Sequence, residues 1–486
     1  MFTIEDKTLL CHQCYVNGQW KDALSGATIE VTNPSDGSAL GSVPDMSREE
    51  IADAIDAANA AWPAWRSKTA AERSGLLRKW FELIMANQKD LAAIMTAEQG
   101  KSLAESTGEI AYAASFMEWF AEEGKRIYGD TIPTHQKGTR IVVIKQPVGV
   151  CTAITPWNFP SAMITRKAAP ALAAGCVMLV KPASQTPFSA LALARLAERA
   201  GIPAGVFSVV TGKSSVIGGE LTQNPIVRKL SLTGSTETGR LLMRQCADTV
   251  KKISLELGGN APFIVFDDAD LDAAVEGAMA CKYRNSGQTC VCANRILVQD
   301  GIYEAFAEKF SAAVKTLRVG DGFQSGIQQG PLIDMHAVEK AESHIEDALS
   351  KGARLLVGGK RHSLGGTFFE PTVLGGVTPK MRVATEETFG PVAPLFRFET
   401  EEQAIQMAND TEFGLASYFY SRDLGRIWRA SEGLEYGMVG INTGILSTAV
   451  APFGGVKQSG IGREGSRYGM DEYVEIKYLC MSGIDR

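Results

Sequence analysis

The chain has 486 residues, of which 45% are hydrophobic and 21% charged, and its formal net charge is -6. Because a domain commonly holds roughly 100–200 residues, this length predicts two or three domains with sizeable cores. The positive charges are scattered, which argues against a protein that binds nucleic acid or a membrane surface. The longest apolar stretch, 168–180, is shorter than the roughly 18 residues of a membrane-spanning helix.

The nine cysteines are spread over the whole chain, and no secretory signal stands at its start. A chain of this size does not need disulfide staples, so we expect free thiols in a reducing, cytoplasmic setting. Cys11 and Cys14 form a CxxC pair, but no second pair at zinc spacing accompanies it. We interpret the pair as accidental, in a mobile amino-terminal arm, and predict no metal site.

Two capping boxes predict where the first long helices begin. Ser47 stands three positions before Glu50, and Thr69 three positions before Glu72. Each box is followed by an apolar stripe at helical spacing, which we expect to pack in the core.

The middle of the chain alternates between short apolar runs and helical patterns. We predict four strands, at residues 148–154, 177–180, 206–210 and 229–233. Residues 187–200 are a predicted helix, and such alternation indicates an α/β fold with a parallel sheet covered by helices on both faces. Ligands of such sheets bind beyond the carboxyl ends of the strands, so a cofactor is expected near Asn158, Lys181 and Gly234.

A second α/β region begins near Phe263 and extends to about Gly455. The segments 140–144 and 473–480 alternate between apolar and polar residues, as strands do, and neither has an obvious partner within the chain. Because unpaired edge strands commonly pair with another subunit, we expect both segments to do so.

Cys290 follows a polar, flexible segment, 285–289, rather than an apolar run. Gly287 permits a close approach of the backbone to a ligand, so an exposed, reactive thiol is favoured over the buried cysteine that is more common in proteins. Cysteine is the best side-chain nucleophile near neutral pH, because its thiolate is accessible.

Two further polar residues have unusual neighbours. Glu256 lies between two leucines at a predicted strand end, where burial would raise its pKa towards the range of a general base. Asn158 lies between two prolines that fix the backbone, so its amide is a candidate oxyanion donor. Alone, the second motif is more typical of a structural turn.

Two loops are candidates for binding a dinucleotide. Lys181 ends a predicted strand, where a lysine can meet a ribose or a phosphate, and the loop 233–239 leads into a helix whose N-terminus attracts phosphate. Each motif is ambiguous alone. Together the motifs supply a thiol, a base, an oxyanion donor and a dinucleotide site, the set required to oxidise an aldehyde through a covalent thioester.

Seven blocks resemble the aldehyde dehydrogenase superfamily in order and spacing. They are 156–160, 181–187, 233–239, 255–260, 287–290, 386–391 and 452–462. The resemblance implies a Rossmann-like dinucleotide-binding domain at 1–123 and 147–258, an α/β catalytic domain at 259–465, and a small β oligomerisation element at 124–146 and 466–486. It also implies homodimers, often paired into homotetramers, in which the tail strand joins a neighbour's sheet.

The resemblance implies a role for each matching residue. Cys290 attacks the aldehyde carbon, Asn158 and the Cys290 backbone N–H hold the oxyanion, and Glu256 activates the water that releases the carboxylate product after hydride has passed to the nicotinamide. The residues implied to bind the cofactor are Trp157, Lys181, Ser184, Gly234, Ser235, Glu387 and Phe389.

Within the superfamily, the chain most resembles succinate-semialdehyde dehydrogenases. The matching blocks are 161–167, 283–285 and 444–447. They imply that Arg166, Arg284 and Ser447 hold the distal carboxylate of the substrate, since an arginine forms a charge-assisted fork with a carboxylate. The alternative is that both arginines form structural ion pairs. Glutarate semialdehyde remains an alternative substrate, because one methylene contributes only about 1–3 kcal/mol of discrimination.

Two finer predictions concern Ser184 and Cys292. Many NAD-using relatives carry a glutamate at the position of Ser184, and a carboxylate there would repel a 2′-phosphate, so we expect NADP to be preferred, with NAD as the alternative. Cys292 is a candidate partner of Cys290 in a reversible disulfide, as in some members of the subfamily, and the alternative is an inert packing cysteine.

Other classes of protein fit the sequence less well. A non-catalytic protein of the same fold would not need Cys290, Glu256 and Asn158, and a thioesterase would leave the loops at Lys181 and Gly234 unexplained. A coenzyme A-acylating relative would not need Glu256 to direct water at the thioester.

Overall fold

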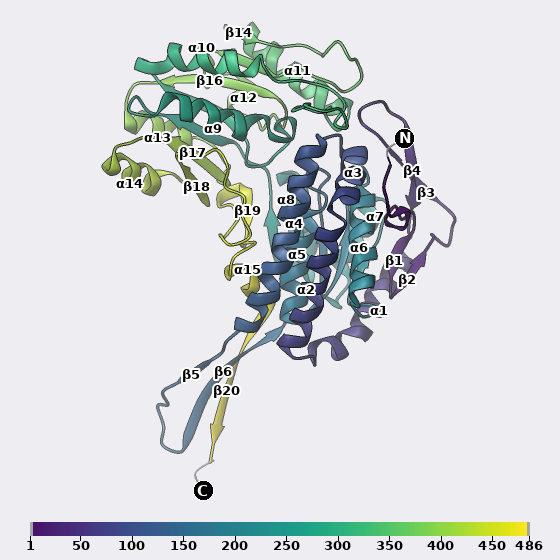
Figure 1. Cartoon of the computed structure of the whole chain (residues 1–486). Coiled ribbons are helices and arrows are strands. Elements are labelled where there is room, and N and C mark those ends of the chain that lie inside the picture. The colour runs from purple at the N-terminus through teal and green to yellow at the C-terminus, as the bar shows by residue number, and fades with distance from the viewer. Residues whose placement is uncertain (1–2, 484–486) are drawn as a thin grey trace.

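The computed structural model describes residues 3–483, which form two large α/β units and a long arm (Figure 1). The first half of the chain forms most of one unit, and the second half forms the other. Among the described residues, no helix has both the length and the apolar character that a bilayer span requires.

The first unit is built on an eight-stranded sheet. Its strands are β1 (Cys14–Val16), β2 (Gln19–Lys21), β7 (Val150–Ile154), β8 (Val177–Lys181), β9 (Phe207–Val209), β10 (Val227–Thr233), β11 (Lys252–Glu256) and β19 (Gly460–Ile461), in the order β19-β11-β10-β7-β8-β9-β1-β2. The run from β11 to β9 is parallel, and antiparallel strands extend it at both ends. The four strands predicted from the sequence are confirmed to within two residues at each end.

Helices cover this sheet. They are α1 (Arg48–Arg66), α2 (Ala70–Ala86), α3 (Gln88–Gln99), α4 (Leu103–Glu123), α5 (Ala162–Ala174), α6 (Pro187–Ala200), α7 (Ser214–Gln223) and α8 (Thr236–Cys246). The chain runs one way along the sheet through α5 and α6 and returns through α7 and α8, so right-handed crossovers place the two pairs on opposite faces. Both predicted capping boxes, at Ser47 and Thr69, are confirmed, and a third at Ser102 begins α4.

The second unit is built on a seven-stranded sheet. Its strands are β12 (Ala261–Val265), β13 (Ala293–Gln299), β14 (Arg354–Val357), β15 (Thr372–Gly375), β16 (Val392–Phe398), β17 (Ala416–Tyr420) and β18 (Met438–Ile441), in the order β14-β15-β16-β13-β12-β17-β18. The associated helices are α9 (Leu271–Tyr283), α10 (Tyr303–Val314), α11 (Met335–Ser350), α12 (Arg382–Thr385), α13 (Glu401–Asn409) and α14 (Leu424–Gly433), and the short α15 (Tyr468–Asp471) packs against α5 in the first unit. Two separate apolar clusters pack against this sheet, so it has a core of its own.

The arm is a three-stranded sheet that projects from the first unit, on the side away from the second (Figure 1). Its strands are β5 (Asp130–Ile132), β6 (Thr139–Pro147) and β20 (Val474–Ser482); a separate hairpin joins β3 (Thr28–Thr32) to β4 (Ala39–Pro44). The expectation that the segments 140–144 and 473–480 lack a partner within the chain is wrong, because they pair with each other antiparallel along their whole length. The sequence pattern gave no sign of this pairing, because the two strands are so far apart in the chain.

The interpretation of the CxxC pair near the amino terminus is also wrong. Cys11 and Cys14 are buried, and Cys14 lies in β1 with its thiol 3.1 Å from the hydroxyl of Thr211. The segment is therefore part of the first sheet and not a mobile arm. Within residues 3–483, all nine cysteines are free thiols, and no group of three histidine, cysteine or acidic side chains is placed to hold a metal.

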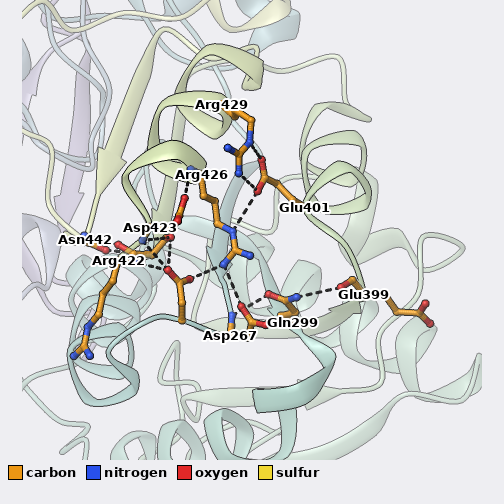
Figure 2. Close-up of polar contacts among 11 residues, drawn as sticks. Asp267, Gln299, Glu399, Glu401, Arg422, Asp423, Arg426, Arg429 and Asn442 are labelled. Carbon is orange, nitrogen blue, oxygen red and sulfur yellow. Dashed lines mark hydrogen bonds and ion pairs between the residues drawn. The ribbon is translucent and has the colours of Figure 1, made fainter.

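Helix α14 is held on the second sheet by five charged side chains, Asp267, Asp268, Glu401, Arg426 and Arg429, which we call the Arg426 network (Figure 2). The guanidinium of Arg426 contacts Asp268 at 2.6 Å, Asp267 at 3.1 Å and Glu401 at 3.2 Å. Glu401 also pairs with Arg429 at 2.6 Å, and Asp268 accepts two backbone N–H groups just before α14. No buried polar side-chain atom of this network lacks a partner.

Candidate active site

A cavity of about 300 Å³, which we call the central cavity, lies between the two large units. Ten of the residues singled out from the sequence line it: Trp157, Asn158, Arg166, Gly234, Ser235, Arg284, Cys290, Glu387, Phe389 and Ser447. Glu256, Lys181, Ser184 and Cys292 are not part of its lining. The fold therefore gathers at one place residues that come from every third of the chain.

The loop before Cys290 has a strained backbone. Asn285, Ser286 and Gly287 are successive left-handed residues with φ of 51°, 58° and 75°, a conformation that costs about 1 kcal/mol or more for each residue with a side chain. A Cβ on Gly287 would lie 2.2 Å from the carbonyl oxygen of Gly390, so only glycine fits. The backbone N–H of Asn285 donates to Glu105 on α4 at 2.7 Å, which helps to hold this conformation.

Cys290 is part-buried and not exposed as the sequence led us to expect. Burial raises the pKa of its thiol to about 12, although the charge of Arg166 acts to lower it. The thiol is therefore protonated near neutral pH, and its reaction as a nucleophile requires a base. The backbone around Cys290 is close to β12, since a Cβ on Gly259 would lie 2.5 Å from the Cys290 carbonyl oxygen.

Glu256 ends β11, as the sequence predicts, and its side chain is buried with no hydrogen-bond partner for Oε2 among residues 3–483. Burial raises the pKa of Glu256 well above its ordinary value, the charge of Glu464 raises it further, and Arg166 and Lys167 oppose the shift. The raised pKa expected from the flanking leucines is confirmed. A carboxyl group with such a pKa is suited to accept a proton near neutral pH.

Glu256 belongs to a buried charge cluster with Arg166, Lys167 and Glu464. We call it the Arg166 cluster. Glu464 accepts from Nε of Arg166 and lies 2.7 Å from Nζ of Lys167. The guanidinium of Arg166 also lies over the ring of Phe453, 4.0 Å from its centroid. Its Nη2 is buried and has no partner in the described chain, although the residue lines the central cavity. Arg166 is thus an ion-pair residue and an open donor at once.

Asn158 is held by hydrogen bonds that depend on a second buried ion pair, between Lys101 and Glu109. Its side-chain Nδ2 donates to the carbonyl of Gln288 at 3.0 Å, and its own carbonyl accepts from Nζ of Lys101 at 2.7 Å and from Nδ2 of Asn285 at 3.0 Å. Lys101 is fixed by Glu109 at 2.5 Å, and Glu109 also accepts two N–H groups at the start of α5. These contacts tie the Asn158 loop and the Cys290 loop together.

The far side of the central cavity has features suited to a nicotinamide ribose and ring. Glu387 accepts the N–H of Gly259 at 3.1 Å, and burial raises its pKa to about 7. The Phe389 ring meets Trp157 edge-on at 5.6 Å, and Phe389 has a left-handed backbone with φ of 54°. Ser235 caps α8, so the free N–H groups of that helix begin at the cavity.

Lys181 and Ser184 lie at the carboxyl end of β8. Nζ of Lys181 donates to the hydroxyl of Ser214, the first residue of α7, at 2.9 Å, and burial lowers its pKa to about 8. Ser184 is partly exposed. Lys213, just before α7, has a side chain that is 72% exposed. This edge of the sheet therefore combines two lysines, hydroxyl groups and a helix N-terminus.

The profile of the aldehyde dehydrogenase family matches residues 20–479. The chain belongs to this family. It is similar to glutarate-semialdehyde dehydrogenase of Pseudomonas aeruginosa, with 66% identity over 99% of this chain and 100% of that protein. It is equally similar to succinate-semialdehyde dehydrogenase [NADP(+)] of Escherichia coli, with 66% identity over 98% of this chain and 99% of that one. A crystal structure of an E. coli NADP-dependent enzyme superposes with a TM-score of 0.98, at 66% identity, over 99% of this chain and 100% of that chain.

The aldehyde dehydrogenase fold predicted from the seven blocks is therefore confirmed. In this family member, Cys292 is buried, donates to the carbonyl of Gly287 at 3.2 Å, and lies 3.8 Å from Nζ of the buried Lys282. Both contacts pack Cys292 behind the loop that carries Cys290.

Several residues of this aldehyde dehydrogenase site were missed from the sequence. Tyr112 and Phe453 line the central cavity, Lys101 and Glu109 hold the Asn158 loop, and Glu464 pairs with Arg166. Tyr112 belongs to the apolar stripe of α4, where a cavity-lining residue and a core residue have the same spacing. For the other four, only the tertiary contacts reveal the role.

Proposed function

We propose that the chain oxidises a semialdehyde with a terminal carboxylate, with succinate semialdehyde as the first candidate and glutarate semialdehyde as the alternative. The observation that carries this proposal is the presence of Arg166 and Arg284 in the cavity that Cys290 lines. Arg284 forms no ion pair in the described chain; its guanidinium lies 4.8 Å from the centroid of the Phe159 ring. Two guanidinium groups near one thiol favour a substrate that brings a negative charge.

In the proposed reaction, Sγ of Cys290 bonds to the aldehyde carbon, and its proton leaves as the bond forms. Glu256, whose charge acts on this thiol, is the proposed acceptor. One N–H of the Asn158 amide is fixed by Gln288, which leaves the other to donate to the aldehyde oxygen together with the Cys290 backbone N–H. Glu256 releases that proton to solvent and then takes a proton from the water that attacks the thioester carbon, so that the carboxylate product and the Cys290 sulfur separate.

A nicotinamide dinucleotide bound at this site would supply the acceptor for the hydride of the aldehyde carbon. The residues proposed to hold it are Trp157, Lys181, Ser184, Gly234, Ser235, Glu387 and Phe389. The buried Glu387 supports this assignment, because one of its carboxylate oxygens has no hydrogen-bond partner within residues 3–483 and can accept from ribose hydroxyls. Gly258 supports it as well, since a Cβ there would lie only 3.0 Å from Glu387.

NADP is the proposed preferred cofactor, and NAD the alternative. At the edge formed by Lys181, Ser184 and Lys213, two lysines and a neutral hydroxyl suit a 2′-phosphate, and Lys213 also lies 3.5 Å from a carboxylate oxygen of Asp45. Ser184→Glu is expected to lower kcat/KM for NADP by at least about tenfold and to change that for NAD much less. Steady-state rates with both cofactors test this. A wild-type enzyme that is more efficient with NAD would contradict the preference.

The substrate is tested by comparing succinate semialdehyde, glutarate semialdehyde and uncharged butanal, each with NADP and with NAD. A kcat/KM for both carboxylated aldehydes far above that for butanal would support a carboxylate site formed by Arg166, Arg284 and Ser447, and the better of the two would identify the substrate. Equal efficiency with butanal would contradict the carboxylate site and leave family membership intact.

We also propose that the three structural parts are functional parts, with cofactor binding at 1–123 and 147–258, chemistry at 259–465, and oligomerisation at 124–146 and 466–486. The exposed Ile476 and Tyr478 on β20 support a homodimer or homotetramer joined through the arm, in a reducing cytoplasm. Light scattering of the purified chain, with and without residues 474–482, tests the assembly.

A regulatory disulfide between Cys290 and Cys292 is the last part of the proposal. A peroxide would oxidise the two thiols to one S–S bond, with release of water and the reduced peroxide, and added thiol would reverse it. Peroxide inactivation that is unchanged in Cys292→Ala, in extent and in recovery by thiol, would exclude this switch.

A further inference from the structure

Tyr112, on α4, lies where two cavities meet. It lines the central cavity together with Arg166, and it also lines an adjoining cavity of about 270 Å³. Arg284 and Ser447 line both cavities as well. The ring of Tyr112 is kept in place by Phe116, which meets it edge-on at 4.9 Å.

The hydroxyl of Tyr112 is buried and has no close hydrogen-bond partner among the described residues, while the side chain of Ser447 is near enough to lower its pKa. Arg166 lines the same cavity, and its Nη2 is also buried without a hydrogen-bond partner among the described residues. A buried donor without an acceptor costs about 1–3 kcal/mol, so two of them beside one cavity indicate that something in the cavity accepts from them.

The charges around Tyr112 define what that acceptor is. Burial raises the pKa of the phenol, while the guanidinium groups of Arg166 and Arg284 act to lower it, so Tyr112 is a neutral donor close to two cations at ordinary pH. The aldehyde oxygen is not the acceptor, because the proposed function places it at Asn158 and Cys290. The acceptor therefore belongs to the other end of the substrate, and the two cations require it to be an anion.

We propose that Tyr112 is a specificity-determining residue whose hydroxyl donates, together with Nη2 of Arg166, to the terminal carboxylate of the substrate. This inference rests on the proposed function and adds a neutral donor to its carboxylate site. The carboxylate offers about four lone-pair positions, enough to accept from Tyr112 and from both arginines at once. The ion pair to Glu464 fixes Arg166 through Nε, which leaves Nη2 aimed at the ligand.

Tyr112→Phe tests the inference, because it removes the hydroxyl and keeps the ring. We expect kcat/KM for succinate semialdehyde to fall about 10- to 100-fold, as for loss of a hydrogen bond to a charged group, and kcat/KM for butanal to stay within about twofold. Inhibition by succinate should weaken by a similar factor, which reports binding of the carboxylate apart from the chemistry. The matched control is Ser115→Ala on the same helix, whose hydroxyl bonds only the Tyr112 carbonyl.

The outcomes separate this inference from the proposed function. If wild-type enzyme oxidises butanal as well as succinate semialdehyde, the carboxylate site is wrong and the inference is overturned with it. If wild type prefers the carboxylated aldehyde and Tyr112→Phe keeps the same preference and the same succinate inhibition, only the assignment of Tyr112 is overturned. Equal losses with both aldehydes would assign Tyr112 a packing role and also overturn it.

Discussion

The Arg426 network and the Arg166 cluster use the same kinds of side chain, but only the Arg166 cluster leaves buried polar atoms without a partner within residues 3–483. In the Arg426 network, the guanidinium of Arg426 is shared by three carboxylates, and no buried polar atom is left without a partner (Figure 2). In the Arg166 cluster, Nη2 of Arg166 and Oε2 of Glu256 are buried without a partner in the described chain. Arg166 lines the cavity that Cys290 also lines, and the charge of Glu256 acts on the Cys290 thiol.

The difference shows how to tell a structural ion network from a functional one. The charges of the Arg426 network pair with one another or reach solvent, so the network holds α14 in place and needs no ligand to complete it. Open atoms are destabilising in the free protein, and they are retained where a ligand or a reacting atom completes them. Counting ion pairs alone would have ranked the two regions as equivalent.

The largest effect is expected at the thiol that the open atoms surround. Cys290→Ala should lower kcat on the order of 10⁴-fold or more, because no other group in the cavity can form the covalent intermediate. Steady-state kinetics measure the loss, and a thermal melt with and without NADP serves as the control for folding and cofactor binding. Residual activity within tenfold of wild type would exclude Cys290 as the nucleophile.

Arg166→Met tests the Arg166 cluster, in which buried atoms lack partners. It removes the free donor and one partner of the buried Glu464, so we expect the preference for succinate semialdehyde over butanal to fall about 10- to 100-fold and the free energy of unfolding to fall by roughly 3 kcal/mol. Kinetics with both aldehydes and urea unfolding provide the two readouts. An unchanged preference with lowered stability would place Arg166 in the same purely structural class as Arg426.

The pH dependence of Cys290 alkylation tests how strongly the cavity favours the neutral thiol. With a pKa of about 12, the thiolate fraction should rise tenfold for each pH unit from 7 to 9, and the rate of inactivation by iodoacetamide should rise with it. Only the thiolate reacts, so the sign is an increase with pH. A plateau near pH 7 would show that the site instead stabilises the thiolate.

The smallest effect on activity is expected for Arg426→Met, the matched change in the paired network. The free energy of unfolding should fall by about 1–2 kcal/mol, less than for Arg166→Met, because solvent reaches and screens these charges. The kcat/KM for both aldehydes should stay within twofold of wild type. A selective loss of activity towards the carboxylated aldehyde would break the distinction between the two regions.

Local features of the fold were predictable from the sequence, and long-range pairings were not. The capping boxes at Ser47 and Thr69 and the strand that ends at Glu256 depend on neighbouring residues, and all three are confirmed. The partner of Arg166 is Glu464, which is 298 residues away and follows no periodic pattern. Lys101 and Glu109 were missed for a related reason, since a lysine in a loop and a glutamate on a helix are usually solvated.

The parts of the site in which the chemistry requires a particular residue type were predictable from the sequence. The parts that depend on backbone or side-chain geometry were not. A thiol, a carboxyl group and an amide at the right spacing identify the reaction. The left-handed backbone at Ser286 has no such signal, because only Asn285 and Gly287 in that turn are residue types that favour this conformation. The role of the Tyr112 hydroxyl could not be predicted either, because residues that line a cavity and residues that pack in the core have the same helical spacing.

The pairing of β20 with β6 has a consequence for how the protein is made. β6 leaves the ribosome long before β20, with the second sheet and most strands of the first between them in the sequence. Until β20 is synthesised, β6 has only the short β5 beside it and presents the apolar run from Ile141 to Ile144 on an open edge. The arm therefore completes last, and its nascent form is the stage at which chaperones or premature association would act on this chain.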